Sequence, residues 1–302
     1  MGSLIPKPSR LNAYGRASRI ATWAATFLLA ATCPAPGQSA YETQFSQGAN
    51  ATLERKFAGK NTSYLLMDAS GSVLAERWPS PQAIAPGSLV KPFLAVAYGE
   101  QHGGKFPTVR CLGASTRCWL PAGHGSLRLE EAIAESCNTY FLELAAGADR
   151  KRLSETLAHY GLNGPPADAP IESLVGLGAA WKETPTALAR AYLTLEKEEH
   201  SVVQGTIVQG MMDSAARGTA RGVDAVLGKE AALAKTGTAP CTHIPRGAAD
   251  GFTVVLYPAP QPRLLLLVRV HGVTGAESAK VAGAMLQSLG IGENTAVIQG
   301  ER

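Results

Sequence analysis

The segment from Pro86 to Phe93 reads PGSLVKPF and places a serine and a lysine at the start of a predicted helix. Pro-Gly ends any earlier element, and the apolar residues that follow recur at helical spacing. Pro92 falls in the first turn, where a missing backbone donor costs least. Because Lys91 follows Ser88 by three residues, its amine lies on the same helix face as the hydroxyl. Alone, the pattern is also typical of a capping serine beside a solvated lysine.

Two other short patterns give this pair a chemical meaning. Ser136-x-Asn138 lies in a helix-rich segment, and Lys235-Thr236-Gly237 lies on a predicted strand. Each alone has an ordinary structural interpretation, either a helix with a buried asparagine or a turn lysine beside β-favouring threonines. Together with the first pattern, in this order, they are the S-x-x-K, S-x-N and K-T-G signatures of an acylating serine enzyme.

The roles of these residues follow from the weakness of a serine nucleophile. A hydroxyl needs an adjacent base, and Lys91 can serve as one if partial burial and the like charge of Lys235 lower its pKa. We expect Ser136 to relay a proton to a leaving amine and Asn138 to hold the substrate amide and Lys91. On the strand, Gly237 would allow a substrate backbone to approach closely.

Periodicity predicts strands, then helices, then strands, then a helix. Residues 63–68 and 72–77 look like a hairpin, and residues 129–228 are mainly helical. Three antiparallel strands are expected at 231–239, 250–258 and 262–272, followed by a closing helix, AESAKVAGAMLQSLG. The predicted fold is α/β of the α+β kind: an antiparallel β-sheet flanked by helices plus an all-helical lobe, with the active site in the cleft between them.

Composition and the N-terminus bear on class and compartment. The 302 residues are 45% hydrophobic with a net charge of +4, and scattered basic residues give no nucleic-acid signature. Basic residues followed by a short apolar run predict that residues 1–40 are a signal peptide or N-terminal anchor. Cleavage near Gly37 or Ala40 is favoured, and lipidation at Cys33 is an alternative. Residues 41–302 then form the functional domain.

Export would place four cysteines in an oxidising compartment, where disulfides persist. Cys111 and Cys118 enclose a short loop and are the expected disulfide pair, while Cys137 and Cys241 could pair or stay free. No CxxC or His-rich spacing indicates a metal, and no cofactor is expected.

Longer stretches around the three patterns resemble a known protein family. APGSLVKPF, GHGSLRLEEAIAESCNTYF, GLGAAWKETPTALARAYLTL, GTARG and ALAKTGTA resemble the transpeptidase domain of class B penicillin-binding proteins, especially the elongation-type enzymes. RCWLPAGHG strengthens that likeness, which covers roughly Tyr64 to Leu289.

The resemblance implies D,D-transpeptidase chemistry on peptidoglycan. Ser88 would attack the penultimate D-Ala carbonyl of a stem peptide, and an amine from a neighbouring stem or water would resolve the acyl-enzyme. The N–H groups of Ser88 and Thr238 would bind the oxyanion, and Lys235, Thr236 and Thr238 would hold the substrate carboxylate. Penicillin should acylate Ser88.

Several alternatives remain open at this point. A serine β-lactamase would need a deacylating base, for which Glu172 is the candidate, and a D,D-carboxypeptidase differs only in its acceptor. A non-catalytic β-lactam sensor or cell-wall scaffold is a third class. The expected partners are stem peptides, β-lactams and cell-wall enzymes, at the periplasm or the outer face of the cytoplasmic membrane, with membrane association only if the N-terminal segment is retained or lipidated.

Overall fold

The computed structural model describes residues 40–59, 61–78, 83–198, 201–227, 231–244 and 246–291. Residues 1–39, which carry almost all of the predicted signal peptide or anchor, including Cys33 and Gly37, lie outside the described part. Within that part, no helix has both the length and the apolar character that a bilayer-spanning segment requires.

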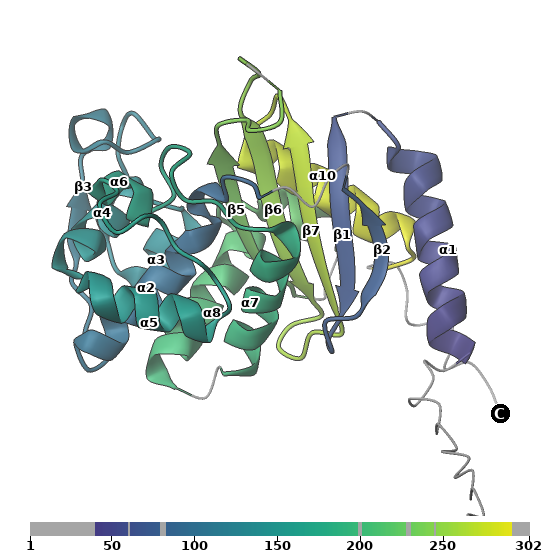
Figure 1. Ribbon diagram of the computed structural model, residues 1–302, viewed down its shortest axis with the longest axis horizontal. Coiled ribbons are helices and arrows are strands. Elements are labelled where there is room, and N and C mark those ends of the chain that lie inside the picture. The colour runs from purple at the N-terminus through teal and green to yellow at the C-terminus, as the bar shows by residue number, and fades with distance from the viewer. Residues whose placement is uncertain are drawn as a thin grey trace, which may run out of the picture. The chain divides into compact units, whose positions relative to one another are not determined.

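A five-stranded antiparallel sheet forms the centre of the molecule (Figure 1). Its strands, in spatial order, are β2 (Val73–Arg77), β1 (Thr62–Asp68), β7 (Leu264–His271), β6 (Asp250–Tyr257) and β5 (Leu233–Ala239). The predicted hairpin therefore joins the three late strands in one sheet, and β5 lies at an edge. This confirms the expected succession of strands and helices along the chain and the α+β class.

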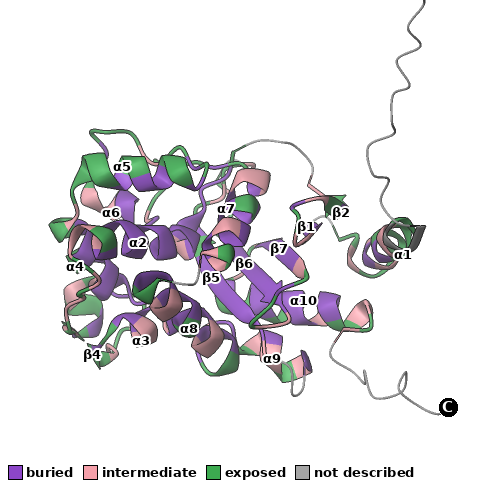
Figure 2. Ribbon diagram, turned by 90° about the horizontal axis from the view of Figure 1, so that it is seen from below, coloured by how far each residue is buried: buried purple, intermediate pink, exposed green. Residues whose placement is uncertain are grey.

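Both faces of the sheet are covered, as the burial colours in Figure 2 show for β5, β6 and β7. The run LLLLV in β7 alternates between two cores: Leu265 and Leu267 belong to one, Leu266 and Val268 to the other. Successive side chains of a strand point to opposite faces, so a strand buried on both sides needs an unbroken apolar run.

One face carries α1 (Ala40–Phe57), α9 (Arg221–Leu227) and α10 (Gly275–Ser288). The other face meets the helical lobe. That lobe contains α2 (Lys91–Gln101), α3 (Leu129–Ala134), α4 (Asn138–Gly147), α5 (Arg150–His159), α6 (Ile171–Leu174), α7 (Pro185–Lys197) and α8 (Val202–Ala216). Thr184 caps α7 by accepting a hydrogen bond from Ala187 N at 3.1 Å, and Pro185 is the first residue of this helix.

Two elements were not expected from the sequence. Helix α1 forms from a stretch that is polar overall, because Phe45, Ala49, Leu53 and Phe57 recur every fourth residue and pack on the second core. A small two-stranded sheet, β3 (Val109–Cys111) and β4 (Gly125–Leu127), encloses a 3₁₀ turn over Gly113–Thr116.

Candidate active site

The turn that carries Ser88 opens onto a cavity between the helical lobe and the edge strand β5. Ser88 lies in a 3₁₀ turn, Gly87–Val90, that leads directly into α2. Tyr192 Oη fastens this turn by donating to Leu89 O at 2.6 Å. The cavity measures about 410 Å³ and is lined by Ser88, Trp119, Ser136, Asn138, Leu177, Thr219, Thr236, Gly237, Thr238, Thr274, Gly275 and Ala276.

The two lysines of the predicted site are fully buried and converge on Ser136. Lys91 Nζ donates to Asn138 Oδ1 and to Ser136 O, both at 2.7 Å, and lies 3.4 Å from Ser136 Oγ. Lys235 Nζ donates to Ser136 Oγ at 2.8 Å and to Thr236 O at 2.7 Å. Ser136 Oγ thus lies between two amines, an arrangement that can pass a proton from one to the other.

Burial alters the protonation of both amines, because an ammonium ion is costly to remove from water. It lowers the pKa of Lys91 to about 7, against the opposing effect of the Cys137 and Cys118 thiols. Burial also lowers the pKa of Lys235 well below its ordinary value, and the charge of Lys91 adds to this effect. A neutral lysine amine at physiological pH is a competent general base.

The backbone at Ser136 adopts an uncommon conformation. Its φ angle is +50°, in the left-handed region that costs a non-glycine residue of the order of 1–3 kcal/mol. This residue joins α3 to α4, and Asn138 is the first residue of α4. In this short connection between the helices, Ser136 Oγ and Asn138 Oδ1 both face the same amine, Lys91 Nζ.

Close packing joins the Ser88 turn to β5. Gly87 has a φ of +58°, and a Cβ there would lie 2.8 Å from Thr238 O. The Thr238 carbonyl therefore faces the turn. In an antiparallel strand the N–H and C=O of one residue point to the same side, so the Thr238 N–H also faces the free edge. A Cβ on Gly237 would meet Pro86 O at 3.0 Å, so this glycine accommodates the protein's own turn.

Six of the residues that line this cavity were not among the predicted site residues, and three of them, Thr219, Gly275 and Trp119, offer polar or aromatic contacts. Thr219 Oγ1 accepts from Thr236 Oγ1 at 2.7 Å, and Gly275 N, at the start of α10, donates to Thr238 Oγ1 at 2.9 Å. Trp119 contributes an exposed ring. Hydroxyl groups beside a helix N-terminus favour an anion. The capping box that opens α10 at Thr274 is the sequence signal that could have indicated this helix start.

A second cavity, of about 880 Å³, adjoins the first and shares Trp119, Thr219 and Ala276 with it. It continues along α9 and the start of α10, where Glu135, Arg221 and other charged residues line it. The two cavities together form a groove longer than a single amino acid requires.

Four residues near the site form a group that we call the cysteine cluster: Cys111, Cys118, His124 and Cys137. The sulfurs of Cys111 and Cys118 each lie 3.5 Å from His124 Nδ1, and Cys118 Sγ lies 3.8 Å from Cys137 Sγ. Every cysteine in the described part of the chain is a free thiol, so the predicted Cys111–Cys118 disulfide is not confirmed.

The reason is that the thiols of the cysteine cluster converge on an imidazole and do not pair with one another. One potential ligand atom from each residue lies within 4.8 Å of the others, and three cysteines with a histidine are a donor set that binds Zn²⁺ in other proteins. These residues could therefore hold a metal ion. Their spacing along the chain did not indicate this, because β3, the loop before β4 and the start of α4 each contribute.

Glu172, the base on which the β-lactamase alternative depends, lies in α6 and forms an ion pair with Arg117. It is not among the residues that line either cavity.

Comparison with solved structures agrees with this fold. PBP2 of Pseudomonas aeruginosa in complex with WCK 5153 has a TM-score of 0.68 and 19% identity, over 87% of this chain and 77% of that chain. The complex of PBP2 with MreC from Helicobacter pylori has a TM-score of 0.65 and 18% identity, over 82% of this chain and 63% of that chain. The transpeptidase domain of FtsI4 from Legionella pneumophila has a TM-score of 0.60 and 20% identity, over 82% of this chain and 95% of that chain.

Sequence comparison is more specific. The peptidoglycan D,D-transpeptidase MrdA of Haemophilus influenzae is 36% identical over 92 residues, which are 28% of this chain and only 14% of that relative's length. The family model of the penicillin binding protein transpeptidase domain matches residues 59–289, which include all three predicted signatures. The chain therefore belongs to the penicillin binding protein transpeptidase domain family.

Proposed function

We propose that the protein is a serine D,D-transpeptidase that transfers the acyl group of a peptidoglycan stem peptide and is acylated by penicillin. One observation carries this proposal. Two buried amines, Lys91 and Lys235, bind the same hydroxyl, Ser136 Oγ, at the wall of the cavity that Ser88 lines. A binding protein without catalysis has no need of this arrangement, because burying two amines is costly.

In the acylation step, Ser88 Oγ attacks the carbonyl of the penultimate D-Ala, and Lys91 takes the hydroxyl proton. The developing oxyanion would be bound by the N–H groups of Ser88 and Thr238, and each such donor commonly contributes about 3 kcal/mol. The C–N bond then breaks, and Ser136 gives a proton to the departing amine of the terminal D-Ala. An ester of Ser88 remains.

In the second step, an acceptor amine attacks this ester, a new amide bond forms and Ser88 regains its proton. The leaving and accepting amines occupy the same position in turn, so Ser136 and Lys235 serve both. Asn138 would orient the substrate amide while it holds Lys91. Each role rests on the hydrogen bonds of these side chains.

The terminal carboxylate of the substrate would bind at the end of the cavity where Thr236, Thr238 and the first residues of α10 meet. There the hydroxyls and the helix N-terminus offer donors to an anion. The larger adjoining cavity would take the rest of the stem peptide, which is consistent with an extended substrate.

We also infer that the protein acts outside the cytoplasm, where peptidoglycan is crosslinked, and that residues 1–40 direct its export. A cell-wall partner is a further expectation, since the Helicobacter pylori PBP2 structure is a complex with MreC.

The test is covalent labelling of the full chain by a fluorescent penicillin, with Ser88→Ala as the negative control and Ser154→Ala, an exposed serine of α5, as the matched control. We expect a persistent adduct on the wild type and on Ser154→Ala, and none on Ser88→Ala. An unlabelled wild type, or an adduct that survives Ser88→Ala, would refute the proposal.

The acceptor is tested with a synthetic stem peptide that ends in D-Ala-D-Ala, with and without an added D-amino acid. A transpeptidase yields the exchanged peptide when the amine is present. A product made of the shortened acid alone would assign D,D-carboxypeptidase activity, and rapid release of hydrolysed penicillin would assign the β-lactamase alternative.

A further inference from the structure

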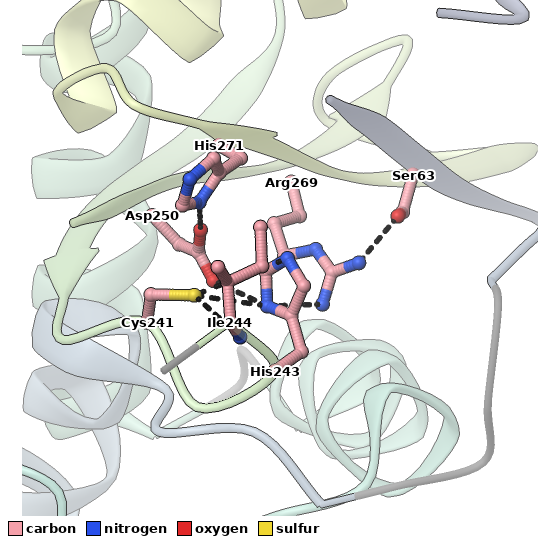
Figure 3. Close-up of polar contacts among 7 residues, drawn as sticks. All are labelled: Ser63, Cys241, His243, Ile244, Asp250, Arg269 and His271. Atoms are coloured by element: carbon pink, nitrogen blue, oxygen red, sulfur yellow. Dashed lines mark hydrogen bonds and ion pairs between the residues drawn. The ribbon is translucent and has the colours of Figure 1, made fainter. Parts of the chain in front are cut away.

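A second group of side chains that could hold a metal ion lies beyond the end of β5. We call it the loop cluster, and it consists of Cys241, His243, Asp250 and His271. Cys241 and His243 come from the loop after β5, Asp250 is the first residue of β6, and His271 is the last of β7. Asp250 and His271 are paired across the sheet. Figure 3 shows the four side chains turned toward one another.

The spacing of the donor atoms fits a single ion. Cys241 Sγ lies 3.2 Å from His243 Nδ1, and His243 Nδ1 lies 3.3 Å from Asp250 Oδ2. His271 Nδ1 lies 2.8 Å from Asp250 Oδ1. One ligand atom from each residue lies within 4.8 Å of all the others. Around a tetrahedral zinc ion with bonds of about 2.0–2.3 Å, neighbouring donor atoms lie about 3.3–3.8 Å apart.

Hydrogen bonds alone account poorly for the position of His243. Its Nδ1 faces the sulfur of Cys241, a carboxylate oxygen of Asp250 and, at 3.4 Å, a guanidinium nitrogen of Arg269. A ring nitrogen either donates one proton or offers one lone pair, so it cannot donate to the first two and accept from the third. A cation at the centre needs no proton there, because the lone pair, the thiolate and the carboxylate all point toward it.

The charge of the site also suits a divalent cation. The Cys241 thiolate and the Asp250 carboxylate supply two negative charges, which offset the ion. Arg269 adds one positive charge nearby, but its NH2 is bound to Ser63 Oγ at 2.7 Å and its guanidinium lies 5.0 Å from the centre of the Trp78 ring. Figure 3 shows Arg269 extending from the cluster toward Ser63.

Burial orders the site and still leaves an entrance. The Asp250 side chain is only 2% exposed, whereas those of His243 and His271 are 23% and 15% exposed. A buried carboxylate that has two imidazoles beside it is held in one orientation, and an ion can reach it from the partly exposed loop.

We propose that the loop cluster binds one zinc ion through the Cys241 thiolate, the His243 and His271 imidazoles and the Asp250 carboxylate. Cysteine, histidine and carboxylate together are a ligand set that suits Zn²⁺ and disfavours Ca²⁺ or Mg²⁺, which prefer oxygen ligands alone. The ion would tie the loop after β5 to the ends of β6 and β7.

This position links the metal to the proposed active site. Cys241 follows Thr238 by three residues, and Thr238 faces the Ser88 turn. Anchoring the loop restrains the end of the edge strand against which a substrate would lie. Zinc is therefore a positioning element for β5, and its loss should lower the acylation rate without removing any group that contacts substrate.

The experiment measures zinc content and stability on the full chain after dialysis against a chelator and reloading with Zn²⁺ alone. The proteins are the wild type, Cys241→Ser, His271→Gln and, as matched control, His159→Gln, whose imidazole pairs with Glu198 at the surface. Because the cysteine cluster could also take an ion, the test compares the zinc content of each variant with that of the wild type.

We expect Cys241→Ser and His271→Gln each to hold one zinc ion fewer per chain than the wild type and to lose the rise in melting temperature on reloading. His159→Gln should match the wild type. Equal zinc content in all four proteins would overturn the proposal.

A second measurement needs no variant and so does not depend on their folding. In the wild type labelled at histidine ring nitrogens, Zn²⁺ should shift the resonances of His243 and His271. The resonances of His102, which stacks on Tyr98 and belongs to neither cluster, should not shift. Unshifted resonances of His243 and His271 at saturating Zn²⁺ would equally overturn the proposal.

Discussion

The strongest prediction concerns the protonation of Lys91, the proposed base for Ser88. Burial lowers the pKa of Lys91 from an ordinary value of 10.5 to about 7. At pH 7, about half of such amines are neutral, whereas an ordinary lysine would be neutral in roughly one molecule in 3,000, a gain of about three orders of magnitude in available base. Protonation removes the base, so acylation should slow as pH falls. Between pH 8 and pH 6 the neutral fraction drops about tenfold.

The assay follows the second-order rate of acylation by a fluorescent penicillin from pH 5.5 to pH 9. We expect an acid limb centred near pH 7 and a plateau above pH 8. Lys91→Ala should lower the plateau by at least about 100-fold, and Lys151→Ala, a matched change of a surface lysine of α5, should leave the profile unaltered. A rate that stays constant between pH 6 and pH 8, or one that still rises steeply at pH 9, would refute Lys91 as the base.

Three other substitutions test separate parts of the structure. Ser136→Ala removes the hydroxyl that binds both amines and should lower acylation at least about 100-fold with an unchanged melting temperature; a smaller effect would exclude it as the relay. Gly87→Ala places a Cβ 2.8 Å from Thr238 O at a φ of +58° and should lower the free energy of unfolding by about 1–3 kcal/mol, measured by urea denaturation; an unchanged midpoint would contradict the close packing. Glu183→Gln alters a fully buried carboxylate that accepts four hydrogen bonds and should lower the free energy of unfolding by about 1–3 kcal/mol in the same assay. A loss below about 0.5 kcal/mol would show that these bonds contribute little to stability.

Local patterns were sufficient for the sheet and the main helices, because these elements carry their own signals. An apolar run such as LLLLV, bounded by Pro and Gly, indicates a strand buried on both faces, and Thr184 followed by Pro185 indicates a helix start. Helix α1 was missed because its stripe of Phe45, Ala49, Leu53 and Phe57 is diluted by polar residues on the remaining faces. In this segment the regular spacing of four apolar side chains determines that a packed helix forms, although the segment is polar on average.

The site was only partly accessible from sequence, for a related reason. Ser88 and Lys91 are three residues apart, so helical geometry alone relates them. Ser136 and Lys235 are 99 residues apart, and their contact depends on how α3 and α4 meet β5. Only the family resemblance predicted that these two residues belong to one site, because no rule of sequence spacing relates residues so far apart. The two clusters of thiol and imidazole groups had no such guide, since their ligands come from separate elements.

Strand β5 lies at the edge of the sheet, and this position accounts for the close contacts that cover it near the proposed active site. An unpaired strand edge exposes backbone donors and acceptors and invites another strand to pair with it. Here the Ser88 turn covers part of the edge of β5 so closely that a Cβ on Gly87 would lie 2.8 Å from Thr238 O and one on Gly237 would lie 3.0 Å from Pro86 O. A peptide could add as a further strand only along the part of this edge that the turn leaves free. Displacing this edge would move the proposed oxyanion donor, the Thr238 N–H, relative to Ser88. A restraint beyond the end of β5, such as the proposed ion in the loop cluster, would therefore act on the proposed catalytic geometry.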